Sequence, residues 1–257
     1  MKIHPTAFVD PAAEIGEDAQ IGCFAVVEAG AKIGDRCTLE GHAQVLSHAE
    51  IGDDCLVGGN SIIGGAPQDL GFDSRVPSKV RIGPGNTFRE NVTIHRSTTE
   101  NGVTEIGSNN YFMVGTHVGH DCVIGERNIL ANQCMLGGHV VLGDGAFLGG
   151  GAGLHQFVRI GSLCMIKGNA SISQDVPPYV IISDSNRVRG LNVIGMRRAG
   201  MNAATRKNVK EAFHQMFLNE RNLQEALDDT LPHEWEPEAQ AFIDFFRGET
   251  TRGVCRP

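Results

Sequence analysis

The 257-residue sequence predicts a mainly β solenoid followed by a small α-helical domain, and three observations support this fold class. Aliphatic side chains recur at every sixth position from Ile3 to Ile63, and the same phase returns after two interruptions and ends at Ile172. Small residues, mostly alanine and cysteine, stand four positions after the aliphatic ones. From about Ser173 the repeat stops and a helical pattern follows. An internal repeat of this length determines the architecture before any motif is considered.

The six-residue period matches neither the period of two of a simple strand nor the 3.6 of a helix. It is typical of a short strand followed by a corner, with three such hexads closing one triangular coil. Coils would stack at about 4.8 Å, the spacing of neighbouring strands, around a narrow core. The pattern resembles the hexapeptide-repeat acyltransferases, whose coils form a left-handed parallel β-helix, and the expected handedness comes from this resemblance.

We expect two domains, a solenoid over residues 1–185 and a helical domain over residues 186–257. Insertions near residues 68–80 and 95–105 interrupt the solenoid. Pro177 and Pro178 oppose continuation of a strand or helix. Apolar periodicity then predicts three helices, over Asn202–Leu218, Leu223–Leu231 and Glu236–Phe246.

Composition and charge exclude several classes of function. The net charge of −8 and the isoelectric point near 5.7 argue against a nucleic-acid-binding protein. The repeat begins at once, which leaves no room for a signal peptide, and no apolar run reaches the length of a membrane span. We therefore expect a cytoplasmic protein without stable membrane insertion. Basic residues between Arg187 and Lys207 form either a patch for an acidic partner or an ordinary solvated surface.

The two interruptions of the repeat are the first candidate sites, because loops that leave a regular scaffold often carry binding groups. The first, between Ile63 and Val80, holds Gln68 and Asp69, although an aspartate in glycine-rich sequence is more often a turn residue. The second lies between Ile94 and Ile106.

A set of histidines is the second candidate site. Four of them fall in one stretch of the solenoid at separations close to one coil of 18 residues: His117, His120, His139 and His155. We expect these imidazoles to converge on one groove. Asp121 follows His120 directly, and a carboxylate beside an imidazole suits general-base catalysis. A zinc site, as in the γ-class carbonic anhydrases, is the competing interpretation; neighbours such as Gln156 and Asp69 favour hydrogen bonding to a polyol, and we expect no metal.

Motifs outside the repeat resemble the family of UDP-N-acetylglucosamine O-acyltransferases, which act first in lipid A synthesis. The resemblance covers almost the whole chain. It rests on QDL at 68–70, VTIHR at 92–96, HVGHDCVIG at 117–125, ILAN at 129–132, GGHV at 137–140, HQF at 155–157, QDVPPYVI at 174–181, GLNVIGMRR at 190–198 and FxxxTTRG at 246–253.

The resemblance implies transfer of a 3-hydroxyacyl chain from acyl carrier protein to the 3-hydroxyl of UDP-N-acetylglucosamine, without a covalent acyl-enzyme. No cofactor is implied beyond the phosphopantetheine of the carrier protein. His120 would be the general base, Asp121 would orient it, and the Gly138 N–H would meet the oxyanion. The remaining residues that the resemblance places at the substrates are Gln68, Asp69, His117, His139, His155, Gln156, Asn192 and Arg198.

The family forms homotrimers with the site between subunits, so the same assembly is implied here. An acyl-chain groove would pass Met165, Lys167 and Gly168, where the glycine leaves room for a longer chain. Gly71, Ile194 and Ala199 depart from the family pattern. The acyl-chain length therefore stays open, as does the choice between a 3-hydroxyl and a 3-amino acceptor.

Other functions stay open at this level. The related N-acyltransferase that acts on UDP-3-acyl-glucosamine has a uridine-binding domain before its solenoid, whereas this repeat begins at Ile3. A coenzyme A-dependent hexapeptide acetyltransferase would lack the loop and tail motifs. A non-catalytic scaffold would explain the repeat but not the converging histidines.

Overall fold

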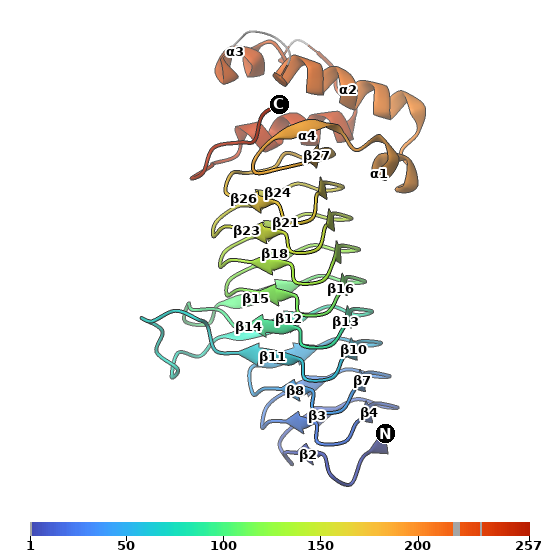
Figure 1. The fold of residues 1–257 in the computed structure, drawn as a ribbon, viewed down its shortest axis with the longest axis vertical. Coiled ribbons are helices and arrows are strands. Elements are labelled where there is room, and N and C mark those ends of the chain that lie inside the picture. Colours follow the sequence, from blue (N-terminus) through green and yellow to red (C-terminus); the bar gives the residue numbers. More distant parts are fainter. Residues whose placement is uncertain (1, 218–221, 232) are drawn as a thin grey trace.

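The computed structural model describes residues 2–217, 222–231 and 233–257. The chain winds into a left-handed parallel β-helix of three sheets, with helices stacked over its C-terminal end (Figure 1). From β1 to β27, strands that follow one another in the chain belong to different sheets, and each pairs with the strand one coil away. Among the described strands every pairing is parallel except that of β27 with β28. The fold class expected from the sequence is therefore confirmed.

Each sheet runs the length of the solenoid. The first sheet contains, in spatial order, β1 (Lys2–Ile3), β4 (Gln20–Ile21), β7 (Thr38–Leu39), β10 (Leu56–Val57), β13 (Thr87–Phe88), β16 (Tyr111–Phe112), β19 (Ile129–Leu130), β22 (Phe147–Leu148), β25 (Met165–Ile166), β27 (Val180–Ile182) and β28 (Val188–Leu191). The second contains β2 (Phe8–Val9), β5 (Val26–Val27), β8 (Gln44–Val45), β11 (Ile62–Gly65), β14 (Thr93–His95), β17 (His117–Val118), β20 (Met135–Leu136), β23 (Gly153–Leu154) and β26 (Ser171–Ile172). The third contains β3 (Glu14–Ile15), β6 (Lys32–Ile33), β9 (Ala49–Ile51), β12 (Lys79–Ile82), β15 (Val103–Ile106), β18 (Val123–Ile124), β21 (Val141–Leu142) and β24 (Arg159–Ile160).

The hexad residues explain this register. Val118 pairs with Ile94 on one side and with Leu136 on the other, and all three side chains are fully buried. The small position is buried as well, as at Ala43 and Cys134. Aliphatic side chains and small residues thus fill one narrow core, as the repeat predicts, and the neighbouring residue of each strand faces outward.

The two insertions leave the solenoid on the same side, near β11 and β14 (Figure 1). The first connects β11 to β12, and the second connects β14 to β15. Both follow strands of the second sheet, so they meet at the corner between the second and third sheets.

Helices cover the C-terminal end of the solenoid. They are α1 (Val193–Arg198), α2 (Ala203–Phe217), α3 (Leu223–Asp228) and α4 (Pro237–Arg247). α2 lies in its expected range, although the expected last residue, Leu218, lies outside the described residues. α4 was expected over Glu236–Phe246 and is shifted by one residue at each end. They pack through aromatic rings, including Phe217 against Phe246 at 5.5 Å between centroids.

Two helices differ from the sequence-based expectation. α3 ends at Asp228, short of Leu231, and the Trp235 indole N–H donates to the Thr230 carbonyl at 3.0 Å in the turn that follows. α1 is not among the three helices expected from the sequence, the first of which begins at Asn202. Its first turn is stabilised by the Asn192 side chain, which accepts a hydrogen bond from the Gly195 N–H. No helix within the described part of the chain has the length and apolar character needed to cross a membrane.

Candidate active site

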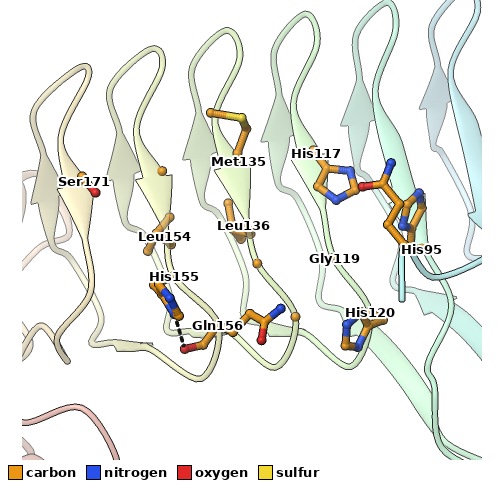
Figure 2. A pocket seen from close by; sticks show the side chains of 14 residues that line it. His95, His117, Gly119, His120, Met135, Leu136, Leu154, His155, Gln156 and Ser171 are labelled. Carbon is orange, nitrogen blue, oxygen red and sulfur yellow. Dashed lines mark hydrogen bonds between the residues drawn. The ribbon is translucent and has the colours of Figure 1, made fainter. Parts of the chain in front are cut away.

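A groove of about 390 Å³ lies on the second sheet and on the corner that leads to the third (Figure 2). Most of the residues that the sequence singles out for substrate and catalysis line it: Gln68, His117, His120, Gly138, His155 and Gln156. Between them the floor is formed by outward residues of β20, β23 and β26, such as Met135 and Ser171. The groove is therefore polar at the corner and becomes less polar along the sheet.

Coil stacking explains why these residues meet. His120, Gly138 and Gln156 occupy one position of three successive coils, and Asp121, His139 and Phe157 occupy the next. The His139 N–H donates to the His120 carbonyl at 2.9 Å, which holds the two coils together at the corner. Of the four imidazoles expected to converge on one groove, those of His117, His120 and His155 line it, whereas that of His139 does not. Separations of 19 and 16 residues, close to but not equal to the 18 of one coil, place His139 and His155 in columns next to that of His120. They nevertheless gather at one corner.

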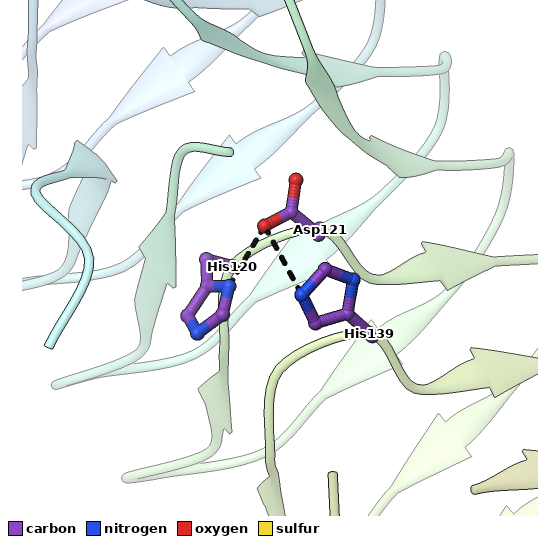
Figure 3. A group of neighbouring side chains, drawn as sticks. All are labelled: His120, Asp121 and His139. Carbon is purple, nitrogen blue, oxygen red and sulfur yellow. Dashed lines mark hydrogen bonds and ion pairs between the residues drawn. The ribbon is translucent and has the colours of Figure 1, made fainter. Parts of the chain in front are cut away.

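His120 and Asp121 form a hydrogen-bonded pair. The His120 Nδ1 lies 2.8 Å from the Asp121 Oδ2, and both side chains are largely buried (Figure 3). The His139 Nε2 lies 3.6 Å from the same oxygen. Phe157 stacks in parallel on the His139 ring, with 4.5 Å between centroids, and holds that imidazole against the carboxylate.

Asp121 is kept ionised by the donors that surround it. Its carboxylate accepts hydrogen bonds from the Ser97 hydroxyl and from the Thr98 hydroxyl and N–H, the last two at 2.7 and 3.1 Å. Burial opposes the charge, but these hydrogen bonds, together with that from His120, outweigh it and lower the pKa of Asp121 to about 2. Ser97 and Thr98 were missed at the sequence level, where only their place in the second insertion could have indicated them.

Gly138 is needed for the His120 ring to lie where it does. A Cβ at Gly138 would stand 2.5 Å from the His120 Cε1 and 2.6 Å from its Nε2. Any side chain there would displace the imidazole. With Nδ1 held by the carboxylate, Nε2 is the ring nitrogen left to face the groove beside Gly138.

Two more histidines form the wall next to this pair. His117 bonds through Nδ1 to the Thr93 hydroxyl at 2.8 Å, and burial, then the nearby His120, lowers its pKa. His95 also lines the groove, with its ring 4.7 Å from that of His117. It is 9% exposed, and burial, then His117 and His120, lowers its pKa to about 4. Both imidazoles are therefore neutral near pH 7.

The first insertion reaches the edge of the groove. Gln68 lines it, while Asp69 is exposed beside Gln68 and accepts a hydrogen bond from the Gly71 N–H at 2.8 Å. Asp69 thus forms the turn expected of an aspartate in such sequence, and its second carboxylate oxygen stays available at the rim.

A second groove, of about 780 Å³, lies on the first sheet and contains three more of the residues expected at the substrates. Met165, Asn192 and Arg198 line it, with Ile129 and Phe147. Ile194 and Ala199, which depart from the family pattern, also lie there. The Lys167 Nζ lies 3.9 Å from the Asp184 Oδ1, and Gly168 lies next to the Gly150 backbone. Lys167 and Gly168 therefore line neither of the two grooves. A single chain therefore does not bring Met165, Asn192 and Arg198 to His120.

The described residues contain one group of side chains with metal-ligand spacing, formed by His120, Asp121 and His139, whose ligand atoms all lie within 4.8 Å of one another. The Asp121 oxygens already accept several protein hydrogen bonds, and one of these comes from His120. The arrangement suits an imidazole–carboxylate pair better than three ligands free to converge on one ion.

Comparison with known proteins extends this description. Residues 175–255 match the family model described as Udp N-acetylglucosamine O-acyltransferase, domain 2, and residues 12–47 and 104–138 match the bacterial transferase hexapeptide model. The acyl-(acyl-carrier-protein)–UDP-N-acetylglucosamine O-acyltransferase of Paraburkholderia phymatum is 42% identical over 99% of each chain. A protein of the same name from Gloeothece citriformis is 40% identical over 74% of this chain and 69% of its own.

Comparison with solved structures points to the same family. The UDP-N-acetylglucosamine acyltransferase of Campylobacter jejuni superposes with a TM-score of 0.94 at 35% identity and covers the whole of both chains. The Arabidopsis UDP-N-acetylglucosamine acyltransferase gives a TM-score of 0.86 at 31% identity, over 98% of this chain and 99% of its own.

Proposed function

Because this chain belongs to the family of acyl-(acyl-carrier-protein)–UDP-N-acetylglucosamine O-acyltransferases, we propose that it moves a 3-hydroxyacyl chain from acyl carrier protein to the glucosamine 3-hydroxyl of UDP-N-acetylglucosamine. The observation that carries this proposal is the buried His120–Asp121 pair facing a groove whose other polar groups suit a sugar. The reaction would be the first step of lipid A synthesis, carried out in the cytoplasm. The donor brings its own phosphopantetheine, so no further cofactor is required.

His120 acts as the general base. With Nδ1–H donating to Asp121, the free lone pair of Nε2 takes the proton of the acceptor hydroxyl as the oxygen attacks the thioester carbon. The carboxylate stabilises the imidazolium that forms, and its low pKa keeps it charged throughout. The proton then passes from His120 to the departing thiolate. The acyl group moves directly to the sugar, without a covalent acyl-enzyme.

Gly138 supplies the oxyanion donor. It lines the groove beside the His120 Nε2, and among the described residues its N–H has no hydrogen-bond acceptor. A preorganised backbone donor at this point would stabilise the negative charge that develops on the thioester oxygen.

The remaining groups around the groove hold the substrates. Gln68 and Asp69 approach from the first insertion, while His117 and Gln156 line the wall and floor. His139 stands behind the base, against Asp121, and His155 supports the corner through its contact with the Gln156 carbonyl at 3.2 Å.

The protein would act as a homotrimer. Asn192 and Arg198 lie in the second groove, on another face of the solenoid, and would reach the nucleotide in the groove of a neighbouring copy. Arginine suits a pyrophosphate through its forked donors. The acyl chain would run between subunits past Met165, Lys167 and Gly168. An interface of this kind encloses a long apolar chain that one solenoid face leaves in water.

Mass spectrometry of the reaction products tests this function. Purified protein receives UDP-N-acetylglucosamine, or its 3-amino analogue, with a series of 3-hydroxyacyl carrier proteins. We expect a singly acylated UDP-sugar and a preference among the acyl chains. The His120→Ala variant should lose about 10²–10⁴-fold in kcat, the usual contribution of a general base. His42→Ala, in an N-terminal coil, should keep wild-type activity. Near-normal turnover by His120→Ala contradicts the base assignment, and absence of any acylated UDP-sugar with the wild-type protein contradicts the function.

A further inference from the structure

We infer that Arg96 is a positioning residue that joins the two insertions and so holds the acceptor-binding loop against the catalytic pair. This role rests on the proposed function, because it assigns the first insertion to binding of the sugar nucleotide. Arg96 directly follows β14 and is only 4% exposed. Among the described residues the hydrogen bonds of its guanidinium go to carbonyl and hydroxyl oxygens and not to a carboxylate, and burial lowers its pKa. A buried cation without a charged partner is costly, and its presence calls for an explanation.

The guanidinium is satisfied by the first insertion. Its Nη1 donates to the Val76 carbonyl at 2.6 Å, and its Nη2 donates to the Ser74 carbonyl at 2.8 Å. The Phe72 ring covers its face, with the Arg96 Cζ 4.8 Å from the ring centroid. The structure assigns neither helix nor strand to residues 66–78, and Leu70 at its tip is fully exposed. One buried side chain from a neighbouring strand end therefore organises this loop.

The contacts continue to Gln68 and Asp69. The Phe72 N–H donates to the Asp69 carbonyl at 3.1 Å, in the turn that the Asp69 carboxylate closes with Gly71. Because the Phe72 ring rests on Arg96, the guanidinium sets the height of this turn over the groove. A shift of the ring would move Asp69 and the neighbouring Gln68 away from the wall of the site.

The contacts also reach the catalytic carboxylate. The Arg96 Nη1 donates to the Ser78 hydroxyl at 2.9 Å, and that hydroxyl donates to the Ser97 carbonyl at 2.5 Å. The Ser97 hydroxyl in turn donates to Asp121. Arg96 thus connects a loop that faces the acceptor with the residues that hold Asp121. Lysine has the charge but not the planar fork that two carbonyls and a hydroxyl require.

The test compares Arg96→Lys and Arg96→Met with the matched controls Arg75→Lys and Arg75→Met. Arg75 is an arginine of the same loop whose exposed side chain pairs, within the described part of the chain, only with Asp73, at 2.7 Å. Two quantities are measured, the hydrogen exchange of amides in residues 66–78 and the steady-state constants for UDP-N-acetylglucosamine. We expect the Arg96 variants to exchange about tenfold faster in this segment, with the solenoid unchanged. Their KM for the sugar nucleotide should rise about tenfold, with a smaller fall in kcat. The Arg75 controls should match the wild type.

If the Arg96 variants show wild-type exchange in residues 66–78 and a wild-type KM, the inference is overturned. A uniform rise of exchange along the chain with an unchanged KM also overturns it, because Arg96 would then stabilise only the fold as a whole. If the Arg96 variants do not fold, Ser78→Ala removes one link only; faster exchange in both insertions supports the inference, and unchanged exchange overturns it. The exchange measurement needs no substrate, so it decides on Arg96 even if the protein fails to acylate UDP-N-acetylglucosamine.

Discussion

At the scale of single residues, burial sets the protonation of the site. His95 and His117 lie in the wall of the groove, and burial keeps both imidazoles neutral near pH 7. Asp121 is also largely buried, yet it remains ionised because four protein donors stabilise the charge. The same site therefore holds two neutral imidazoles and a charged carboxylate next to His120, the residue proposed as the general base.

The low pKa of His95 predicts a pH-dependent stability. In the unfolded chain the imidazole binds a proton below about 6.5, whereas in the folded protein it does so only below about 4. Stability should therefore be complete above the unfolded value and should fall as the pH drops from about 6.5 towards 4, by roughly 1–3 kcal/mol. Urea unfolding at pH 7.5 and pH 5 measures this change. His95→Gln should reduce the loss, and the exposed control His4→Gln should retain it. An equal loss in wild type and His95→Gln contradicts the role of His95.

At the scale of the repeating element, three asparagines stand at the small inward position of successive coils. Asn86, Asn110 and Asn128 are all buried, and each side-chain oxygen accepts the backbone N–H of the corresponding residue in the next coil. The Asn110 amide also donates to the Asn86 oxygen and to the Gly125 carbonyl, at 3.0 and 2.9 Å. In contrast, the Asn128 amide nitrogen is buried without a partner. The ladder thus replaces core packing by hydrogen bonds between coils.

This ladder predicts unequal costs for two similar substitutions. Asn110→Ala removes one hydrogen-bond partner each from the Asn128 N–H, the Asn86 side-chain oxygen and the Gly125 carbonyl. It should therefore lower the free energy of unfolding by roughly 2–4 kcal/mol. Asn128→Ala leaves only the Ala146 N–H without its partner and removes a group that was already unsatisfied. Its cost should be smaller by about 1 kcal/mol or more. Chemical unfolding of both variants measures the difference, and equal costs would contradict this account.

At the scale of the whole molecule, the outward surface changes character along the solenoid. On the third sheet the outward-pointing side chains of paired strands form a column along the solenoid. This column alternates in charge through the N-terminal half and then becomes apolar at Val123 and Val141, which are both exposed. On the first sheet Gln20 stands near the start of a column that continues to Ile129, Phe147 and Met165, again exposed. Exposed apolar columns of this kind are typical of contact surfaces. They lie on the coils that carry the site.

The proposed homotrimer therefore predicts a position-dependent effect of added charge. Phe147→Lys places a cation in the second groove, between Ile129 and Met165, and should lower the measured mass from that of three chains to that of one. Acyl transfer should fall with it, because Asn192 and Arg198 no longer meet a neighbouring site. Gln20→Lys, in the same outward column but in an N-terminal coil, should leave mass and activity unchanged. Sedimentation equilibrium measures the mass. A trimeric Phe147→Lys protein would show that this groove lies outside the interface.

Much of the fold could be predicted because its contacts are periodic. Each coil hydrogen-bonds to the next at a regular spacing, so the six-residue pattern sets which side chains face inward, as at Val118 and Leu136. The same regularity places His120, Gly138 and Gln156 together. The spacing of the histidines departs from this regularity. A shift of one residue from the coil length put His139 above Asp121, where it contacts the carboxylate rather than lining the groove.

The amino-acid sequence by itself determined the solenoid, its two interruptions and the pairing of His120 with Asp121, because these depend on spacing along the chain. Only the tertiary structure decided how Ser97 and Thr98 hold Asp121, how Arg96 anchors the first insertion, and that Asn192 and Arg198 lie on another face. Those contacts join segments without a common period. Their geometry is set by hydrogen bonds and burial between distant parts of the chain, which a local pattern does not encode.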